Sequence, residues 1–260
     1  MEIQSTYIPY SSKRYPVYAG NGMVCSSSPQ AAAAGLEAMK KGGNAMDAAV
    51  ATAAALTVCE PTANGIGGDA FALIWVEKEQ KLYGLNASGV SPKNISIEKV
   101  RERTGEDTMP TFGWIPTMVP GAPAGWAAVS ERFGAIPMTE SMAPAVKYAR
   151  DGYPCSPNLA KMWQRAYNKY KTLFGDKEEF AEWFKTFAPN GKVPKEGDII
   201  KLPNHADTLE LIAKSKAEEF YRGSLAEKIV KDSEELGGYY CKEDFANYKP
   251  QWVEPISVNY

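Results

Sequence analysis

Hydrophobic and polar positions follow helical spacing over much of the chain, most clearly in two alanine-rich segments near its start. The first segment predicts a helix over residues 29–41, with the serine before its proline as the cap. Gly42 and Gly43 end it, because glycine tolerates the positive φ found at helix C-termini. Asn44 can cap a second helix over residues 45–58, and Asp47 suits the dipole of its first turn. Almost every residue of the second helix is small or apolar, so we expect it to be buried on most sides.

Shorter apolar segments predict strands. Residues 71–76, FALIWV, are typical of a fully buried strand, and residues 81–86 complete a hairpin with it. A short strand is also predicted over residues 23–25. The alternation of Ile256 and Val258 predicts a last strand that continues to the end of the sequence.

Further helices are predicted over residues 97–104, 124–133, 143–151, 159–187, 206–215, 224–233 and 241–248, with a short strand after Gly197-Asp198. The aromatic residues at helical spacing in 159–187 are typical of a core or a helix–helix contact rather than a cofactor site. Residues 1–22, polar and aromatic, predict a loosely packed entry arm. Without repeats or a linker, we predict a single unit over residues 1–260.

Composition narrows the functional classes. The 260 residues are 44% hydrophobic and 23% charged, with a net charge of −2, so neither nucleic acid nor a membrane is predicted as a partner. No apolar run reaches the ~18 residues of a membrane span. The N-terminus lacks a signal-peptide pattern, which predicts a cytoplasmic protein. The four cysteines form no CxxC pair, and we expect free thiols.

The single histidine, His205, limits the possible chemistry. It excludes an HExxH motif or any two-histidine metal site within this chain, and it leaves one possible histidine base for a triad. Two interpretations are open: a catalytic base, or a residue in the first turn of a surface helix capped by Asn204 or Asp207. The second is favoured. No metal and no cofactor are predicted.

Residues 65–70, GIGGDA, match the dinucleotide fingerprint GxGxxA in letters only. That fingerprint requires a strand before it and a helix after it, whereas here a helix precedes and a strand follows. We therefore expect a tight loop whose backbone N–H groups line a small pocket that a substrate can approach. No serine stands in a GxSxG motif, so caps and turns are favoured for Ser26, Ser27, Ser28 and Ser88.

Residues 23–71 resemble the N-terminal part of the γ-glutamyltransferase family. The blocks GGNAMDAA, EP and GIGGDAF stand in the order of the family pattern ILKKGGNAVDAAVA, EP, SGIGGGGF. The resemblance continues through VPG at 119–121, GWAAVSERFGAIPMTESMAPAVKYARDGYPCSP, FYRGSLAEKIV and EDFANYKPQWVEPISVNY, so it covers essentially the whole chain.

The resemblance implies an α+β protein with the four-layer αββα sandwich of N-terminal-nucleophile (Ntn) hydrolases, of which this chain is the leading part of the large subunit. Family precursors cut themselves in two, and the freed N-terminal threonine of the small subunit attacks a small-molecule amide with its own amino group as base. The implied partner is that small-subunit polypeptide, and a homo-oligomer is also open. Because the threonine lies beyond residue 260, no catalytic residue is assigned here.

One departure from the family affects specificity. Members specific for γ-glutamyl groups have an arginine after the hairpin, in a motif such as LDFRExAP, that pairs with the substrate carboxylate. Here the matching stretch is LNASGVSP, and Ser88 takes the place of the arginine. Loss of such a pair typically costs ~2–5 kcal/mol. We expect Asn86 and Ser88 to bind the acyl group, as in the branch similar to oxamate amidohydrolases and cephalosporin acylases.

Two alternatives are open. One is a true γ-glutamyltransferase in which another basic residue replaces the arginine. The other is a non-catalytic, truncated chain that acts as a scaffold or binding partner.

Overall fold

The computed structural model describes residues 16–259, so the prediction of an entry arm falls mostly outside the described residues. The two alanine-rich helices are confirmed as α1 (Pro29–Lys40) and α2 (Ala45–Cys59). Asn44 caps α2: its side-chain oxygen accepts the N–H groups of Met46 and Asp47, and Asp47 accepts the N–H of Asn44 in return. Ser28 makes no such cap on α1, because its hydroxyl is directed to the side chain of Gln30.

Small residues let α1 and α2 lie close together. The buried face of α1 consists of Ala31, Ala34, Gly35 and Ala38. A Cβ atom at Gly35 would lie 2.4 Å from the hydroxyl of Thr52 on α2, so only glycine fits there. Most of α2 is buried, as its composition predicts.

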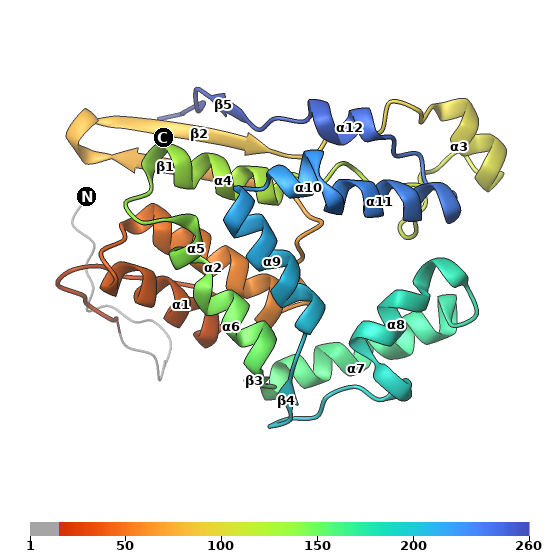
Figure 1. Ribbon diagram of the computed structural model, residues 1–260, viewed down its shortest axis with the longest axis horizontal. Helices are drawn as coiled ribbons and strands as arrows, with labels where there is room; N and C mark the ends of the chain where they lie inside the picture. Colours follow the sequence, from red (N-terminus) through yellow and green to blue (C-terminus); the bar gives the residue numbers. More distant parts are fainter. Residues whose placement is uncertain (1–15, 260) are drawn as a thin grey trace.

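The main sheet has three antiparallel strands in the order β1-β2-β5: β1 (Ala70–Val76), β2 (Lys81–Ala87) and β5 (Gln251–Val253). The prediction that residues 71–76 are fully buried is wrong. Phe71, Leu73 and Trp75 are 66%, 72% and 51% exposed, whereas Ile74 on the opposite face is buried. The helices of the described chain cover only one face of this sheet (Figure 1).

Helix α4 (Ala122–Phe133) lies against the covered face of the sheet, between it and α2 (Figure 1). The approach is close because α4 presents Gly125 to the strands. A Cβ atom there would lie 2.9 Å from the Cβ atom of Ala87. The end of β2 and the start of α4 are thereby held together, and the candidate site forms at this junction.

The other helices surround this centre. They are α3 (Ile97–Thr104), α5 (Met138–Ser141), α6 (Ala143–Asp151), α9 (Pro203–Ser215), α10 (Glu218–Arg222), α11 (Ser224–Glu235) and α12 (Lys242–Asn247). The sequence predicted all but the short α5 and α10. No side chain caps α9, so the capping roles expected of Asn204 and Asp207 are wrong.

The predicted aromatic helix over residues 159–187 is two helices, α7 (Pro157–Phe174) and α8 (Ala181–Phe187). The break follows α7 at Gly175, and the aromatic side chains then join the helices, as expected for a helix–helix contact. Tyr170 contacts Trp183 at 4.7 Å between ring centroids, and Phe174 stacks on Phe180 at 4.1 Å. The strands β3 (Tyr153–Pro154) and β4 (Ile199–Ile200) pair where this segment leaves and rejoins the helical layer.

One predicted strand is absent and another is shorter than predicted. Residues 23–25 have no regular structure, and the last strand ends at Val253. Pro255 has no N–H to donate to a ladder, and Ile256 and Val258 lie fully exposed beyond it.

All four cysteines are free thiols, of which Cys59 and Cys155 are buried. Burial raises the pKa of the Cys59 thiol to about 12. Among residues 16–259, no helix combines the length and the apolar composition that a bilayer span requires.

Candidate active-site pocket

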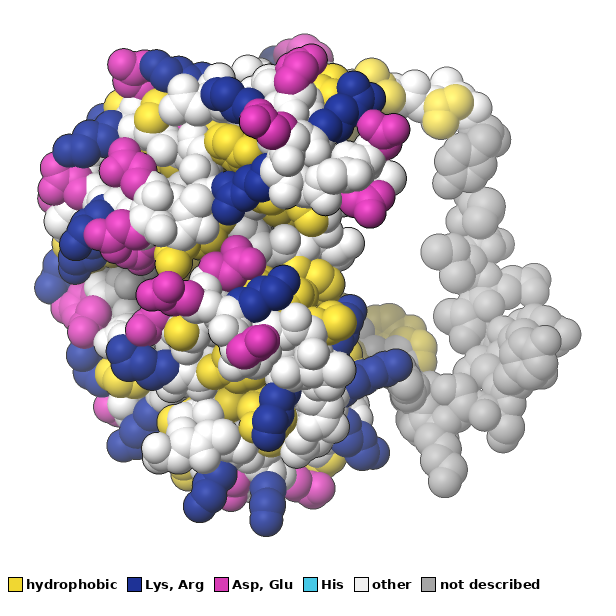
Figure 2. Space-filling model, turned by 90° about the vertical axis from the view of Figure 1, so that its right-hand side faces the viewer, with side chains coloured by type: hydrophobic (Ala, Val, Ile, Leu, Met, Phe, Trp, Pro, Cys, Tyr) yellow, Lys and Arg dark blue, Asp and Glu magenta, His cyan; other side chains and the backbone are white. Residues whose placement is uncertain are grey.

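A cavity of about 740 Å³ opens where the glycine loop, the end of β2 and the starts of α4 and α9 meet. On the face shown in Figure 2, hydrophobic side chains gather in the middle, between regions rich in charged side chains. The lining is mainly apolar, as is usual for ligand sites. It consists of Ile66, Gly67, Gly68, Asp69, Ser88, Gly89, Trp114, Thr117, Met118, Val119, Pro120, Thr186, Asn204, His205, Thr208, Phe220, Ile229 and Tyr240.

Backbone contacts fix the glycine loop against α4. The carbonyl oxygen of Gly68 accepts the N–H groups of Gly121 and Ala122, at 2.9 and 3.0 Å. Cβ atoms at Gly89 and Gly121 would lie 1.8 Å from the carbonyl oxygens of Val119 and Ala87, respectively. Three backbone segments therefore converge at distances that side chains would prevent. The loop lines a pocket, as the sequence predicted.

The two predicted substrate-binding residues occupy different places. Ser88 is part of the pocket lining. Asn86 pairs with Phe71 on the uncovered face of the sheet and does not line this pocket. They are linked, because the side-chain oxygen of Asn86 accepts the N–H of Ser88 at 2.9 Å. Asn86 thus orients the turn that places Ser88, and whether either binds substrate stays a prediction.

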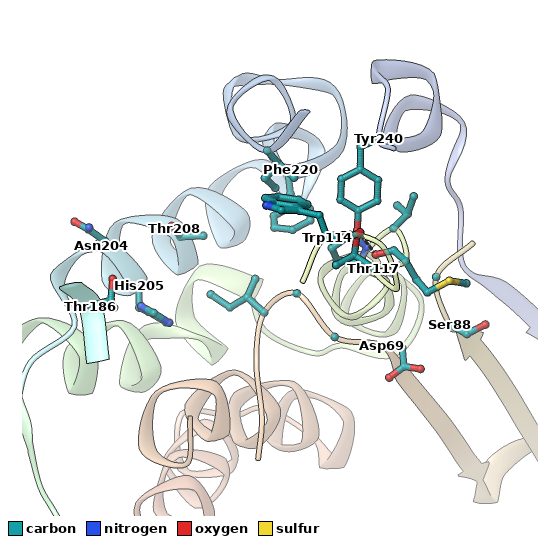
Figure 3. A pocket seen from close by; sticks show the side chains of 18 residues that line it. Asp69, Ser88, Trp114, Thr117, Thr186, Asn204, His205, Thr208, Phe220 and Tyr240 are labelled. Carbon is teal, nitrogen blue, oxygen red and sulfur yellow. Dashed lines mark hydrogen bonds between the residues drawn. The ribbon is translucent and has the colours of Figure 1, made fainter. Parts of the chain in front are cut away.

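Three aromatic residues, Trp114 and Tyr240 from loops and Phe220 from α10, form one wall of the pocket (Figure 3). Tyr240 donates its hydroxyl to the carbonyl of Met118 and packs edge-on against Trp114, with 5.9 Å between ring centroids. Outside the lining, Tyr221 donates to the carbonyl of Pro120 at 2.5 Å. Burial raises the pKa of Tyr240, so its hydroxyl stays protonated at neutral pH. The wall is uncharged.

His205 lies at the opposite end of the pocket from Ser88, beside Asn204 and Thr208 (Figure 3). It is half-buried in the first turn of α9, with its ring 5.7 Å from that of Phe187. The prediction of His205 in the first turn of a helix is therefore confirmed, but the sequence did not predict that His205 lines a pocket. No group of three or more potential metal ligands occurs in the described part of the chain.

We expect His205 to titrate below the ordinary histidine range, because burial lowers its pKa by disfavouring the charged imidazolium. The unfolded state then binds the proton more tightly, so this residue should make the protein less stable as the pH falls below ~6.5. The measurement is an NMR titration of the imidazole C–H signal, assigned by its absence from His205→Gln. An apparent pKa of ~6.5 or higher would contradict the burial.

The gamma-glutamyltranspeptidase family model matches residues 31–260. The chain belongs to the gamma-glutamyltranspeptidase family. Among relatives, it is 33% identical to the glutathione hydrolase-like YwrD proenzyme of Bacillus subtilis, over 92% of this chain and 44% of that protein. It is 32% identical to the glutathione hydrolase proenzyme of Escherichia coli, over 95% of this chain and 42% of the relative. The chain thus spans less than half the length of these relatives.

Solved structures of gamma-glutamyltranspeptidase relatives have the same fold. The cephalosporin acylase of Bacillus halodurans superposes with a TM-score of 0.93 at 51% identity, over 98% of this chain and 47% of the other. The gamma-glutamyltranspeptidase of Helicobacter pylori gives 0.86 at 30% identity, over 94% of this chain and 69% of the other. These matches confirm the predicted α+β, Ntn-hydrolase fold.

Sequence reasoning missed much of the pocket. Trp114 and Thr117 lie more than a hundred residues before Tyr240 in the sequence, and no local sequence pattern connects the three. The one signal was the Val-Pro-Gly sequence at 119–121, whose glycine marks a close backbone approach.

Proposed function

We propose that the protein is a self-processing amidohydrolase or acyltransferase of the gamma-glutamyltranspeptidase family, with this chain forming the leading part of its large subunit. The nucleophile is the N-terminal threonine of a small subunit outside this sequence. Its hydroxyl oxygen attacks the amide carbon while its amino group takes the proton and passes it to the leaving amine. Water or an amine then attacks the resulting ester, which releases the acyl group and restores the hydroxyl.

The uncovered sheet face carries this proposal. Phe71, Leu73 and Trp75 form an apolar stripe that a stable protein buries. The small-subunit polypeptide is the occupant we propose, since the chain spans less than half of its relatives. Asn86 lies on the same face, and its side chain holds the N–H of Ser88, so a threonine brought by that partner would lie near the turn that carries Ser88.

We expect Leu73→Ser to destabilise the full-length protein by about 2–4 kcal/mol, because a buried leucine loses its packing. In the described chain alone, Leu73 is 72% exposed. Leu173→Ser is the matched control, since Leu173 is 45% exposed on α7, away from the sheet. Urea unfolding of both variants makes the comparison. Equal, small effects would show that nothing covers the stripe.

Substrate comparison tests the acyl specificity. Of the described residues that line the pocket, none is a lysine or arginine that could pair with the α-carboxylate of a γ-glutamyl group. We expect the full-length enzyme to hydrolyse γ-glutamyl-p-nitroanilide less efficiently than hexanoyl-p-nitroanilide, which carries no carboxylate, with Asn86 and Ser88 holding the acyl group. Efficient turnover of the γ-glutamyl compound would instead favour the alternative, a true γ-glutamyltransferase. A full-length protein that neither cleaves itself nor hydrolyses either amide would favour a scaffold.

A further inference from the structure

Asp69 is the single carboxylate that lines the pocket within the described chain. It belongs to the glycine loop, is exposed, and enters no hydrogen bond or ion pair with residues 16–259. Figure 3 places it at the same end of the pocket as Ser88, away from His205. The charge is therefore available to a ligand rather than neutralised by the fold.

A third residue, Tyr248, lies near both Asp69 and Ser88. Tyr248 donates its hydroxyl to the carbonyl of Ser88 at 2.9 Å. The pKa of Tyr248 is raised chiefly by burial, and next by the negative charge of Asp69. The Tyr248 hydroxyl thus lies near the negative charge of Asp69 and in contact with the backbone of Ser88, which places both residues at one end of the pocket.

Among the lining residues that the structure describes, no lysine or arginine offsets this carboxylate. The other end of the pocket holds His205, whose pKa burial lowers, so the imidazole is neutral at pH 7. The lining is otherwise formed by apolar, hydroxyl and amide groups. In an apolar cavity, one unopposed charge has a strong effect on which ligand charge is accepted.

We infer that Asp69 is a specificity-determining residue that selects amides whose acyl group carries a positively charged amine and rejects those that carry a carboxylate. The inference rests on the proposed amidohydrolase function and names its substrate class. The family pattern quoted above has glycine where this chain has Asp69, and arginine where it has Ser88. Both differences make this end of the pocket more negative. A more negative pocket repels a carboxylate and attracts a protonated amine.

Three p-nitroanilides of matched acyl length test the inference with the full-length enzyme: δ-aminovaleryl, hexanoyl and glutaryl. They place a cation, a methyl group and an anion at the same distance from the amide. We expect kcat/KM to fall in that order, with the cationic substrate preferred over the anionic one at least ~100-fold at low salt. High salt should reduce the preference, because it screens the charge of Asp69.

The decisive variant is Asp69→Asn, which removes the charge and keeps the shape. It should reduce the ratio of kcat/KM between the cationic and anionic substrates at least tenfold. Asp69→Gly introduces the residue of the family pattern and should reduce the ratio similarly. It provides a second variant in case Asp69→Asn does not fold. Asp176→Asn is the matched control, an exposed aspartate in the turn after α7, and should leave the ratio unchanged.

The outcomes separate the two proposals. A wild-type enzyme that hydrolyses these amides with a ratio unaffected by either Asp69 variant overturns the inference alone. A ratio that Asp176→Asn changes equally also overturns it, because the effect is then one of net charge. A protein that neither cleaves itself nor hydrolyses any of the three amides overturns the proposed function and this inference together.

Discussion

Gly121→Ala should destabilise the protein severely, by at least ~3 kcal/mol, since overpacking against backbone admits little relaxation. The added methyl would lie 1.8 Å from the carbonyl oxygen of Ala87 at the end of β2. To make room, either α4 or the strand must move, and the two hydrogen bonds from the start of α4 to Gly68 would then break. Thermal unfolding should show a fall in Tm of roughly 6–12 °C for a domain of this size.

Gly20→Ala is the control for this substitution. A methyl at Gly20 meets no atom within 4 Å, and its φ is not positive, so the same chemical change should leave Tm nearly unchanged. If both variants unfold at the wild-type temperature, the close contact between the glycine loop, β2 and α4 is not present in the protein.

Asp47→Ala should cost about 2–4 kcal/mol, because it removes the acceptor of two part-buried backbone N–H groups, at about 1 kcal/mol each or more, and opens a small cavity. The carboxylate is fully buried, and its Oδ2 accepts the N–H groups of Asn44 and Ala135, both at 2.8 Å. It joins the start of α2 to the loop after α4. Urea unfolding should measure the loss.

Two further variants sharpen this prediction. Asp47→Asn retains one acceptor oxygen and should lose less than the alanine variant. Asp176→Ala removes an exposed aspartate outside any such network and should change the unfolding free energy by no more than ~0.5 kcal/mol. Equal losses for Asp47→Ala and Asp176→Ala would contradict a role for the buried carboxylate.

Local signals predicted most of the fold. Helix α2 is marked by a cap, an acidic first turn and a continuous small apolar stretch, and all three are observed. The pattern of residues 71–76 was misjudged because an apolar run does not say whether one or two layers cover a strand. The end of β5 was misjudged because Pro255 outweighs the alternation of Ile256 and Val258. The single unit over residues 1–260 stays a prediction.

The candidate site was only half visible in the sequence. The glycine loop and Ser88 could be found, since both stand in recognisable local patterns. His205 could not be placed in the pocket, because the fold of α8 and α9 brings it there rather than any neighbouring residue. Asp69 was read as one letter of a nucleotide fingerprint, and its unopposed charge became apparent only with the lining around it.

The most direct test of the proposed function is the mass of the protein produced from its complete reading frame. The account predicts that the purified precursor divides into two fragments on its own, at a rate independent of its concentration, and that the smaller fragment begins with threonine. Replacement of that threonine by alanine should leave the precursor whole. A full-length protein that stays uncut, or one whose smaller fragment begins with a residue that has no nucleophilic side chain, would contradict the account.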